Sequence, residues 1–222
     1  MNKSMARKTT DLARREGIIF ILSAPSGTGK TTLIKGLRAA YPELRLSVSC
    51  TTRGRRQGEV HGRDYYFLES KKFAVLKAKG EFAEWAKVHD FFYGTPRRPL
   101  EQSVRLGQDI LLDIDVQGAR KIKRKYPQAV SIFLVPPSWR ELQRRLARRG
   151  TDGEEIIRRR LVNARSEIRN IIKYDYYVVN RQVRESLGLL KSIVEAERAK
   201  TFRVKRWRIE PLYWQQRELG HD

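Results

Sequence analysis

The stretch APSGTGKTT, at residues 24–32, decides the fold of this chain. It follows an apolar run, GIIFIL at residues 17–22, and precedes a helix-like segment, LIKGLRAAY at residues 33–41. In this order of strand, glycine-rich turn and helix, backbone N–H groups converge on phosphate oxygens at the positive end of a helix dipole. The stretch therefore predicts a phosphate-binding loop that follows a buried parallel strand.

Two side chains of this loop are expected to act on a nucleoside triphosphate. In loops of the pattern GxxxxGK[ST], the lysine reaches the β- and γ-phosphates and the hydroxyl ligates Mg²⁺, which assigns these roles to Lys30 and Thr31. Ala24 stands where the pattern has its first glycine. Because a backbone N–H at negative φ can still donate a hydrogen bond, we do not regard this difference as disabling.

The composition is that of one medium-sized domain. The chain has 222 residues, and no apolar run approaches the ~20 residues of a membrane span. The basic leader, residues 1–16, lacks the apolar stretch of a secretory signal. Cys50 is the only cysteine, which favours a reducing cytoplasm, and the three histidines are too dispersed to predict a transition-metal site.

The net charge of +22 has two interpretations. It is typical either of a nucleic-acid-binding protein or of an enzyme for polyanionic substrates with a basic, solvated surface. The charge is spread along the chain without zinc-finger or RRM-type patterns, so nucleic acid is not expected as the main partner. In the tail, residues 201–222, the aromatic residues Trp207, Tyr213 and Trp214 are interpreted as packing on the domain or on a second copy, with a nucleic-acid contact as the alternative.

Apolar strands alternate with helical segments through most of the chain. After the first strand, further strands are predicted in DILLDID at 109–115, AVSIFLVPP at 129–137 and YDYYVVN at 174–180. Capping-box spacing predicts helices that begin after Ser138 and after Thr151, the second running over 154–173. This alternation predicts a doubly wound parallel sheet flanked by helices, with a core of residues 17–45 and 98–200.

Residues 46–97 do not continue this alternation. The alternation of Leu44, Leu46 and Val48 with polar residues predicts a half-buried strand leading into them. An arginine- and glycine-rich segment is followed by a strand in DYYFL, a short helix, and two strands joined near residues 89 and 90. We therefore expect a small mixed α/β insertion.

Carboxylates follow one of the core strands at its carboxyl end. Asp113 and Asp115 would lie at the ligand edge of the sheet, where one can hold Mg²⁺ and the other can bind a substrate; the alternative is a pair of turn residues. In the insertion, guanidinium and phenol groups would form a clamp for a monophosphate, although each tyrosine alone could be an ordinary strand residue. The clamp residues are Arg53, Arg56, Tyr65 and Tyr93.

Glu84, in the segment EFAEWA, could select the base. A carboxylate accepts two parallel hydrogen bonds from guanine N1–H and N2–H₂, a donor pair that adenine lacks on that edge; the alternative is an exposed strand glutamate. Arg145, Arg149 and Arg160 flank a glycine-bearing break and could form a lid that meets the charge on a transferring phosphoryl group, unless they belong to solvated helix faces.

These motifs together resemble the guanylate kinase family. The resemblance rests on APSGTGKTTL, SVSCTTRGRRQGEVHGRDYYF, EFAEWA, YGTP, ILLDIDVQGA and RRGTD…RRRL, and it covers residues 17–200. It implies a phosphate-loop NTPase core, an inserted GMP-binding subdomain at 46–97 and a helical lid at about 140–160. It also implies transfer of the γ-phosphoryl group of ATP to GMP, giving ADP and GDP, with Mg²⁺; tolerance of dGMP and the oligomeric state are left open.

The resemblance also implies a role for individual residues. It implies that the metal would lie at or near Thr31 and Asp115, and that Glu59 would orient the arginine clamp. The residues implied to bind ATP are Ala24, Pro25, Ser26, Gly27, Thr28, Gly29, Lys30, Thr31, Thr32 and Asn180. Those implied to bind GMP are Ser49, Arg53, Arg56, Glu59, Tyr65, Glu84, Tyr93, Thr95, Asp113 and Asp115. The catalytic cations are Lys30, Arg53, Arg145, Arg149 and Arg160.

Three other functions are compatible with parts of this sequence. Guanylate kinase-like domains also serve as non-catalytic peptide-binding scaffolds, but those tend to have a degraded phosphate loop, whereas Lys30, Thr31 and both aspartates are present here. A nucleic-acid-binding protein remains a second alternative, based on the charge and the aromatic tail. A kinase for another monophosphate is a third, and Glu84 argues against AMP as its substrate.

Overall fold

The structure, a computed structural model, describes residues 15–88, 90–148 and 153–203. Its core is a five-stranded sheet in which every neighbouring pair is parallel. The strands are β1 (Ile19–Ser23), β2 (Arg45–Leu46), β7 (Ile110–Asp113), β8 (Val130–Val135) and β9 (Tyr176–Val179). Their order in the sheet is β2-β7-β1-β8-β9, which places β1 and the loop after it at the centre.

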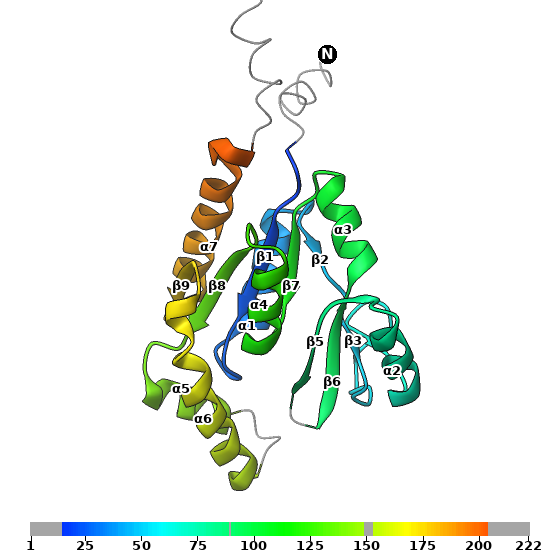
Figure 1. Cartoon of the computed structure of the whole chain (residues 1–222). Helices are drawn as coiled ribbons and strands as arrows, with labels where there is room; N and C mark the ends of the chain where they lie inside the picture. Colours follow the sequence, from blue (N-terminus) through cyan, green and yellow to red (C-terminus); the bar gives the residue numbers. More distant parts are fainter. Residues whose placement is uncertain (1–14, 89, 149–152, 204–222) are drawn as a thin grey trace, which may run out of the picture.

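Helices cover both faces of the core sheet (Figure 1). On one face, the first and last helices pack on β1 and its neighbours through side chains such as Leu37 and Leu190. On the other face, two further helices pack through Leu100 and Ile122. The helices are α1 (Lys30–Ala40) and α7 (Val183–Arg198) on the first face, and α3 (Arg97–Arg105) and α4 (Val116–Lys125) on the second. The prediction of a doubly wound parallel sheet is confirmed.

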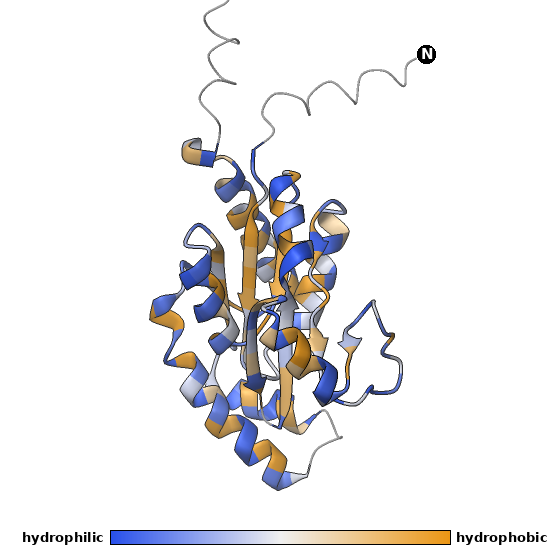
Figure 2. Ribbon diagram, turned by 45° about the vertical axis from the view of Figure 1, so that its right-hand side comes forward, coloured by the Kyte–Doolittle hydropathy of each residue, from blue (hydrophilic) through white to orange (hydrophobic). Residues whose placement is uncertain are grey.

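The continuous apolar runs explain why these strands are central. Every residue of β1 is buried, as a strand covered on both faces requires. Figure 2 shows these hydrophobic strands running through the middle of the molecule, with the hydrophilic residues of the helices facing outward. No helix within the described ranges is long and apolar enough to cross a membrane.

A second sheet, built from elements between Cys50 and Pro96, lies beside the core (Figure 1). The insertion expected over 46–97 therefore begins later than predicted, because Leu46 is still paired in the core sheet, and Arg97 already begins α3. The second sheet is mixed, because β3 pairs with β4 in parallel and with β6 antiparallel. Its helix packs on it through Phe73, whose ring stacks on Phe82 at 4.6 Å. The elements are β3 (Cys50–Thr51), β4 (Tyr66–Phe67), α2 (Ser70–Ala78), β5 (Phe82–Val88) and β6 (Phe91–Pro96), and the strand order is β4-β3-β6-β5.

Two helices, α5 (Trp139–Ala147) and α6 (Glu154–Ile168), pack against each other through a small cluster that includes Leu142, Leu146 and Ala164. Ser138 caps α5 as predicted, its side chain accepting a hydrogen bond from the Glu141 N–H at 3.1 Å. Thr151, the other expected cap, lies outside the described residues.

Some elements are shorter than the sequence indicates. The helix expected over 154–173 ends at Ile168 and is followed by a 3₁₀ turn, Ile171–Lys173. The Asn170 side chain donates to the Ser166 carbonyl at 3.0 Å and competes with the helical backbone there. The strand expected to reach Val48 is β2, which ends at Leu46 because the chain then crosses to the second sheet.

The two ends of the described chain are attached to the core. Arg15, in the segment expected to be a flexible leader, forms a two-pronged ion pair with Asp109, at 2.6 and 2.7 Å. At the other end, Thr201–Arg203 form a 3₁₀ turn, and the Arg203 guanidinium pairs with buried Glu197 at 2.8 Å. The aromatic residues of the tail, Trp207, Tyr213 and Trp214, lie outside the described residues.

Candidate active site

The loop after β1 is a turn that two glycines make possible. Gly27 and Gly29 have φ of 88° and 95°, in the left-handed region that side chains disfavour. A Cβ on Gly29 would lie 2.7 Å from the Asn180 side-chain nitrogen. Gly29 is also the N-cap of α1, so the loop presents its backbone at the positive end of that helix. This is the geometry of an anion-binding loop.

Lys30, the first residue of α1, joins the loop to the neighbouring strand. Its ammonium lies 2.6 Å from Asp113 Oδ1, and Asp113 ends β7, which pairs with β1. Both side chains are partly exposed, at 22% and 33%. Thr31 and Thr32 follow in the first turn of α1 and are exposed. The predicted ATP-side cation and one predicted GMP-side carboxylate are therefore in direct contact.

A buried network fixes the phosphate loop from behind. The Asn180 side chain donates to the Thr28 carbonyl at 2.7 Å and accepts from the Ser186 hydroxyl at 3.0 Å. The Arg145 guanidinium donates to the Thr28 and Asn180 carbonyls at 3.2 and 3.1 Å. The structure thus gives Asn180 a bracing role that the sequence did not reveal, while its contact with adenine stays a prediction.

A cavity of 190 Å³ lies between the core and the second sheet. Seven residues with predicted roles converge there from both sheets and the phosphate loop: Lys30, Ser49, Tyr65, Glu84, Tyr93, Asp113 and Asp115. Its wall on the side of the second sheet also includes Ala86 and Val88. The cavity therefore combines one cation, three carboxylates and two phenols beside the phosphate loop.

Glu84 faces this cavity because of an irregularity in β5. The register of β5 against β6 shifts between Phe82 and Glu84. Phe82 consequently packs on the far side of the sheet, whereas Glu84 and every second residue after it line the cavity. The Thr95 hydroxyl donates to Glu84 at 2.7 Å. Burial of Glu84, which is 6% exposed, raises its pKa to about 7 against the opposing effect of Thr95.

Gly118, in α4, provides the space that Glu84 occupies. A Cβ at this position would lie 2.9 Å from Glu84 Oε2. No role was predicted for this glycine from the sequence; the signal that could have revealed it is a glycine within a segment whose other residues favour a helix.

The predicted monophosphate clamp is partly assembled. Arg53 pairs with Glu59 at 2.7 and 3.0 Å, as expected for a glutamate that orients it. The Arg53 guanidinium also lies over the Tyr65 ring at 5.5 Å. Arg56 is exposed, and its backbone N–H donates to Glu59 at 2.9 Å. The loop that carries these residues therefore holds Arg53 in place, whereas the Arg56 side chain extends into solvent.

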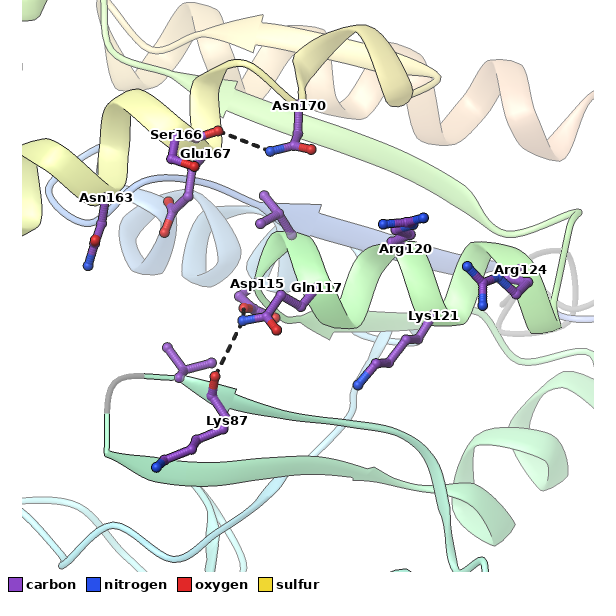
Figure 3. A pocket seen from close by; sticks show the side chains of 12 residues that line it. Lys87, Asp115, Gln117, Arg120, Lys121, Arg124, Asn163, Ser166, Glu167 and Asn170 are labelled. Carbon is purple, nitrogen blue, oxygen red and sulfur yellow. Dashed lines mark hydrogen bonds between the residues drawn. The ribbon is translucent and has the colours of Figure 1, made fainter.

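Asp115 sits at the start of α4, where it accepts a hydrogen bond from the Gly118 N–H at 2.9 Å. It lines a second, larger cavity of 620 Å³ with Glu167 of α6 (Figure 3). Burial raises the pKa of Glu167 to about 7; Lys30 opposes this effect and Asp115 adds to it. Glu167, which shares this cavity with Asp115, was not predicted from the sequence.

Two of the three arginines expected in a lid lie in different parts of the structure, and the third is not among the described residues. Arg145 contacts the back of the phosphate loop, as described above. Arg160 lies on α6 and is half-buried. Arg149 falls outside the described residues. A catalytic role for these arginines stays a prediction.

A parallel sheet with a phosphate loop at its centre, beside a cavity lined by an inserted sheet, defines the class of phosphate-loop nucleotide kinases. Comparison with known proteins identifies the family within this class. A sequence model of the guanylate kinase family matches residues 16–197. The chain therefore belongs to the guanylate kinase family, as its motifs suggested.

Individual relatives agree with this assignment over nearly their whole length. The guanylate kinase of Geobacter metallireducens is 52% identical over 191 residues, which cover 86% of this chain and 94% of the relative. That of Symbiobacterium thermophilum is 44% identical over 197 residues, covering 89% and 93%. The crystal structure of guanylate kinase from Anaplasma phagocytophilum superposes with a TM-score of 0.75 at 37% identity and covers 90% of this chain and 97% of that one.

Proposed function

We propose that this protein transfers the γ-phosphoryl group of ATP to GMP and releases ADP and GDP. The observation that carries the proposal is the position of Glu84, which is buried in the same cavity that Lys30 of the phosphate loop enters. A base held by Glu84 would direct its own phosphate toward the loop. The membership of the chain in the guanylate kinase family supports the same reaction.

On the ATP side, the loop N–H groups and Lys30 would hold the phosphates. The oxygen ligands available beside them fit Mg²⁺. Thr31 is exposed in the first turn of α1, and Asp115 lies between β7 and α4, in the wall of the 190 Å³ cavity. Mg²⁺ prefers a few such oxygen ligands together with phosphate oxygens and water. When bound, the ion would neutralise charge on the β- and γ-phosphates.

On the GMP side, Glu84 would accept from guanine N1–H and N2–H₂, with the Thr95 hydroxyl holding the carboxylate at 2.7 Å. Arg53, Tyr65 and Tyr93 would hold the monophosphate through charge-assisted and neutral hydrogen bonds. Catalysis would consist of alignment and charge stabilisation without a covalent intermediate. Closure of α5 and α6 over the site would exclude water and protect ATP from hydrolysis.

The proposal is tested by a coupled assay of ADP release with GMP, dGMP, AMP, CMP and UMP offered in turn. We expect turnover with GMP and none above background with AMP, CMP or UMP. The matched variant is Glu84→Gln, which keeps the shape of the side chain but replaces one acceptor oxygen with a donor. This variant should weaken the binding of GMP far more than the binding of ATP. The proposal would be overturned if AMP were turned over as fast as GMP, or if Glu84→Gln weakened the binding of GMP and of ATP equally.

A further inference from the structure

Strand β5, which carries Glu84, is the edge strand of the second sheet. It pairs with β6 on one side. The carbonyls of Trp85 and Lys87, two residues apart, point to the same side of the strand, and both accept hydrogen bonds from side chains of α4 on the side away from β6. Unpaired carbonyls at a sheet edge require donors from water or from another element. Here helix α4 of the core provides them.

Two side chains of α4 donate to this edge. The Gln117 side-chain nitrogen donates to the Lys87 carbonyl at 3.3 Å, and the Lys121 ammonium donates to the Trp85 carbonyl. Figure 3 shows Gln117 and Lys121 extending from α4 toward β5. Residues four apart on a helix lie on one face, about 6 Å from each other, close to the distance between alternate residues of a strand. The two donors therefore match two successive outward carbonyls.

The Lys121 contact is reinforced by the ring of Trp85. The Lys121 ammonium lies 4.5 Å from the ring centroid, and the Lys77 ammonium of α2 lies 3.7 Å from it. The Trp85 ring thus interacts with one cation from its own subdomain and with one from the core. This arrangement fixes the backbone of β5 at the residue next to Glu84.

The same helix faces Glu84 from the core side. Gly118 of α4 lies against Glu84 Oε2, so a small movement of β5 relative to α4 would move the carboxylate within the cavity. We propose that Gln117 and Lys121 are positioning residues that set guanine selectivity by fixing the edge strand that carries Glu84. This inference rests on the proposed function, because it assumes that Glu84 binds guanine.

Selectivity is the property that such a device controls. Guanine offers two donors to a carboxylate, whereas hypoxanthine, the base of IMP, keeps N1–H and lacks the 2-amino group. A well-placed Glu84 forms both hydrogen bonds with GMP and one with IMP. A displaced Glu84 would first lose the hydrogen bond from the 2-amino group. The kcat/KM for GMP would then fall more than the kcat/KM for IMP, which never had that bond. The ratio of kcat/KM for GMP to that for IMP therefore reports the position of Glu84.

The test compares Gln117→Ala, Lys121→Met and the double variant with a matched control, Arg124→Met. Arg124 lies on α4 and lines the same 620 Å³ cavity; within the described residues it forms no hydrogen bond or ion pair with β5. We expect the GMP-to-IMP ratio to fall about tenfold in the double variant and less in each single variant, because small misplacements in a site have large kinetic effects. KM for ATP, and the ratio in Arg124→Met, should stay at the parent values.

The outcomes separate the inference from the proposed function. If the parent protein does not phosphorylate GMP, or does not prefer GMP to IMP, the proposed function fails. If the parent prefers GMP and the folded double variant keeps the full preference, the inference fails. A second measurement repeats the double variant in the Glu84→Gln background. In that background, Gln117→Ala and Lys121→Met together should not change the GMP-to-IMP ratio further. A change as large as in the parent background would also overturn the inference.

Discussion

Lys30 is the residue at which the two halves of the site meet. Its ion pair with Asp113, at 2.6 Å, connects the phosphate loop to the wall of the 190 Å³ cavity. Because both side chains are partly exposed, the pair adds little to the stability of the fold. The ammonium can therefore exchange the carboxylate for the phosphates of ATP at little cost.

The first prediction concerns this ammonium. Lys30→Met should lower kcat by roughly 10²–10³-fold, the effect of removing one donor that stabilises transition-state charge. Thermal unfolding should change little, for the reason just given. The control is Lys35→Met, which removes an exposed lysine from the same helix. Turnover of GMP by Lys30→Met at near the parent rate would contradict the mechanism.

The second prediction concerns the ionisation of Glu84. Its pKa is raised to about 7, chiefly by burial, and only the ionised carboxylate accepts both hydrogen bonds from guanine. The kcat/KM for GMP should therefore rise with pH through this value. The phosphate of GMP titrates at about 6, so the profile must be compared with that of Glu84→Gln, which should lack the step at the higher pH. Identical profiles for the two proteins would rule the assignment out.

The raised pKa of Glu84 also predicts how the stability of the fold depends on pH. Whereas kcat/KM for GMP rises with pH, the stability should fall. Between the ordinary glutamate pKa of about 4.3 and the raised value, the folded state retains a proton that the unfolded state has lost. The contribution of Glu84 to stability therefore falls as the pH rises through this range. Glu84→Gln should be more stable than the parent above pH ~8, by on the order of 3 kcal/mol, and the difference should vanish below pH ~4. Urea unfolding at the two pH values measures it.

At the scale of elements, α4 joins the chemistry of the two sheets. Its N-cap is the predicted metal ligand Asp115, and its second turn begins near Gly118, which touches Glu84. Further along, Lys121 reaches the edge of β5. One short helix therefore contacts both sheets and carries or touches two predicted site residues, Asp115 and Glu84.

The third prediction uses the glycine in this helix. Gly118 lies in the first turn of α4, where alanine gains at most about 1 kcal/mol of helix propensity over glycine. This gain offsets part of the crowding, so Gly118→Ala should change the unfolding temperature little. Its methyl group would nevertheless displace Glu84, to which a Cβ would approach within 2.9 Å. We expect KM for GMP to rise about tenfold or more with KM for ATP unchanged. Gly188→Ala is the matched control, because no atom lies within 4 Å of a Cβ there.

The elements show which parts of this arrangement could be predicted from sequence. The apolar runs predicted the core strands, and Ser138 with Glu141 predicted the start of α5, since both signals are local. The face of β5 that Glu84 occupies depends on a bulge against β6. The roles of Gly118 and Asn180 depend on segments far away in the chain. Contacts of this kind leave little trace in a single sequence.

At the scale of the whole molecule, Asp109 connects the two ends of the described chain. Its side chain, 1% exposed, pairs with Arg15 at 2.6 Å and with Arg198 of α7 at 2.8 Å, and accepts from the Ile18 N–H at 2.9 Å. Burial alone would raise the pKa of Asp109, but these donors together lower it. This network lies at the start of β7, at the opposite end of the strand from Asp113.

The fourth prediction follows from this separation of stability and chemistry. Asp109→Asn leaves two half-buried guanidinium groups without their shared carboxylate and should lower the free energy of unfolding by about 3–5 kcal/mol. The kcat of the folded fraction should be unchanged, since Asp109 is remote from the cavity. A carboxylate with a lowered pKa stabilises the fold above its ordinary pKa of about 3.9, so the difference from the parent should be constant near neutrality and shrink in acid. Urea unfolding across pH measures this, with exposed Asp90→Asn as the control. A loss of stability as small as that of the control would show that the network does not hold the chain ends to the core.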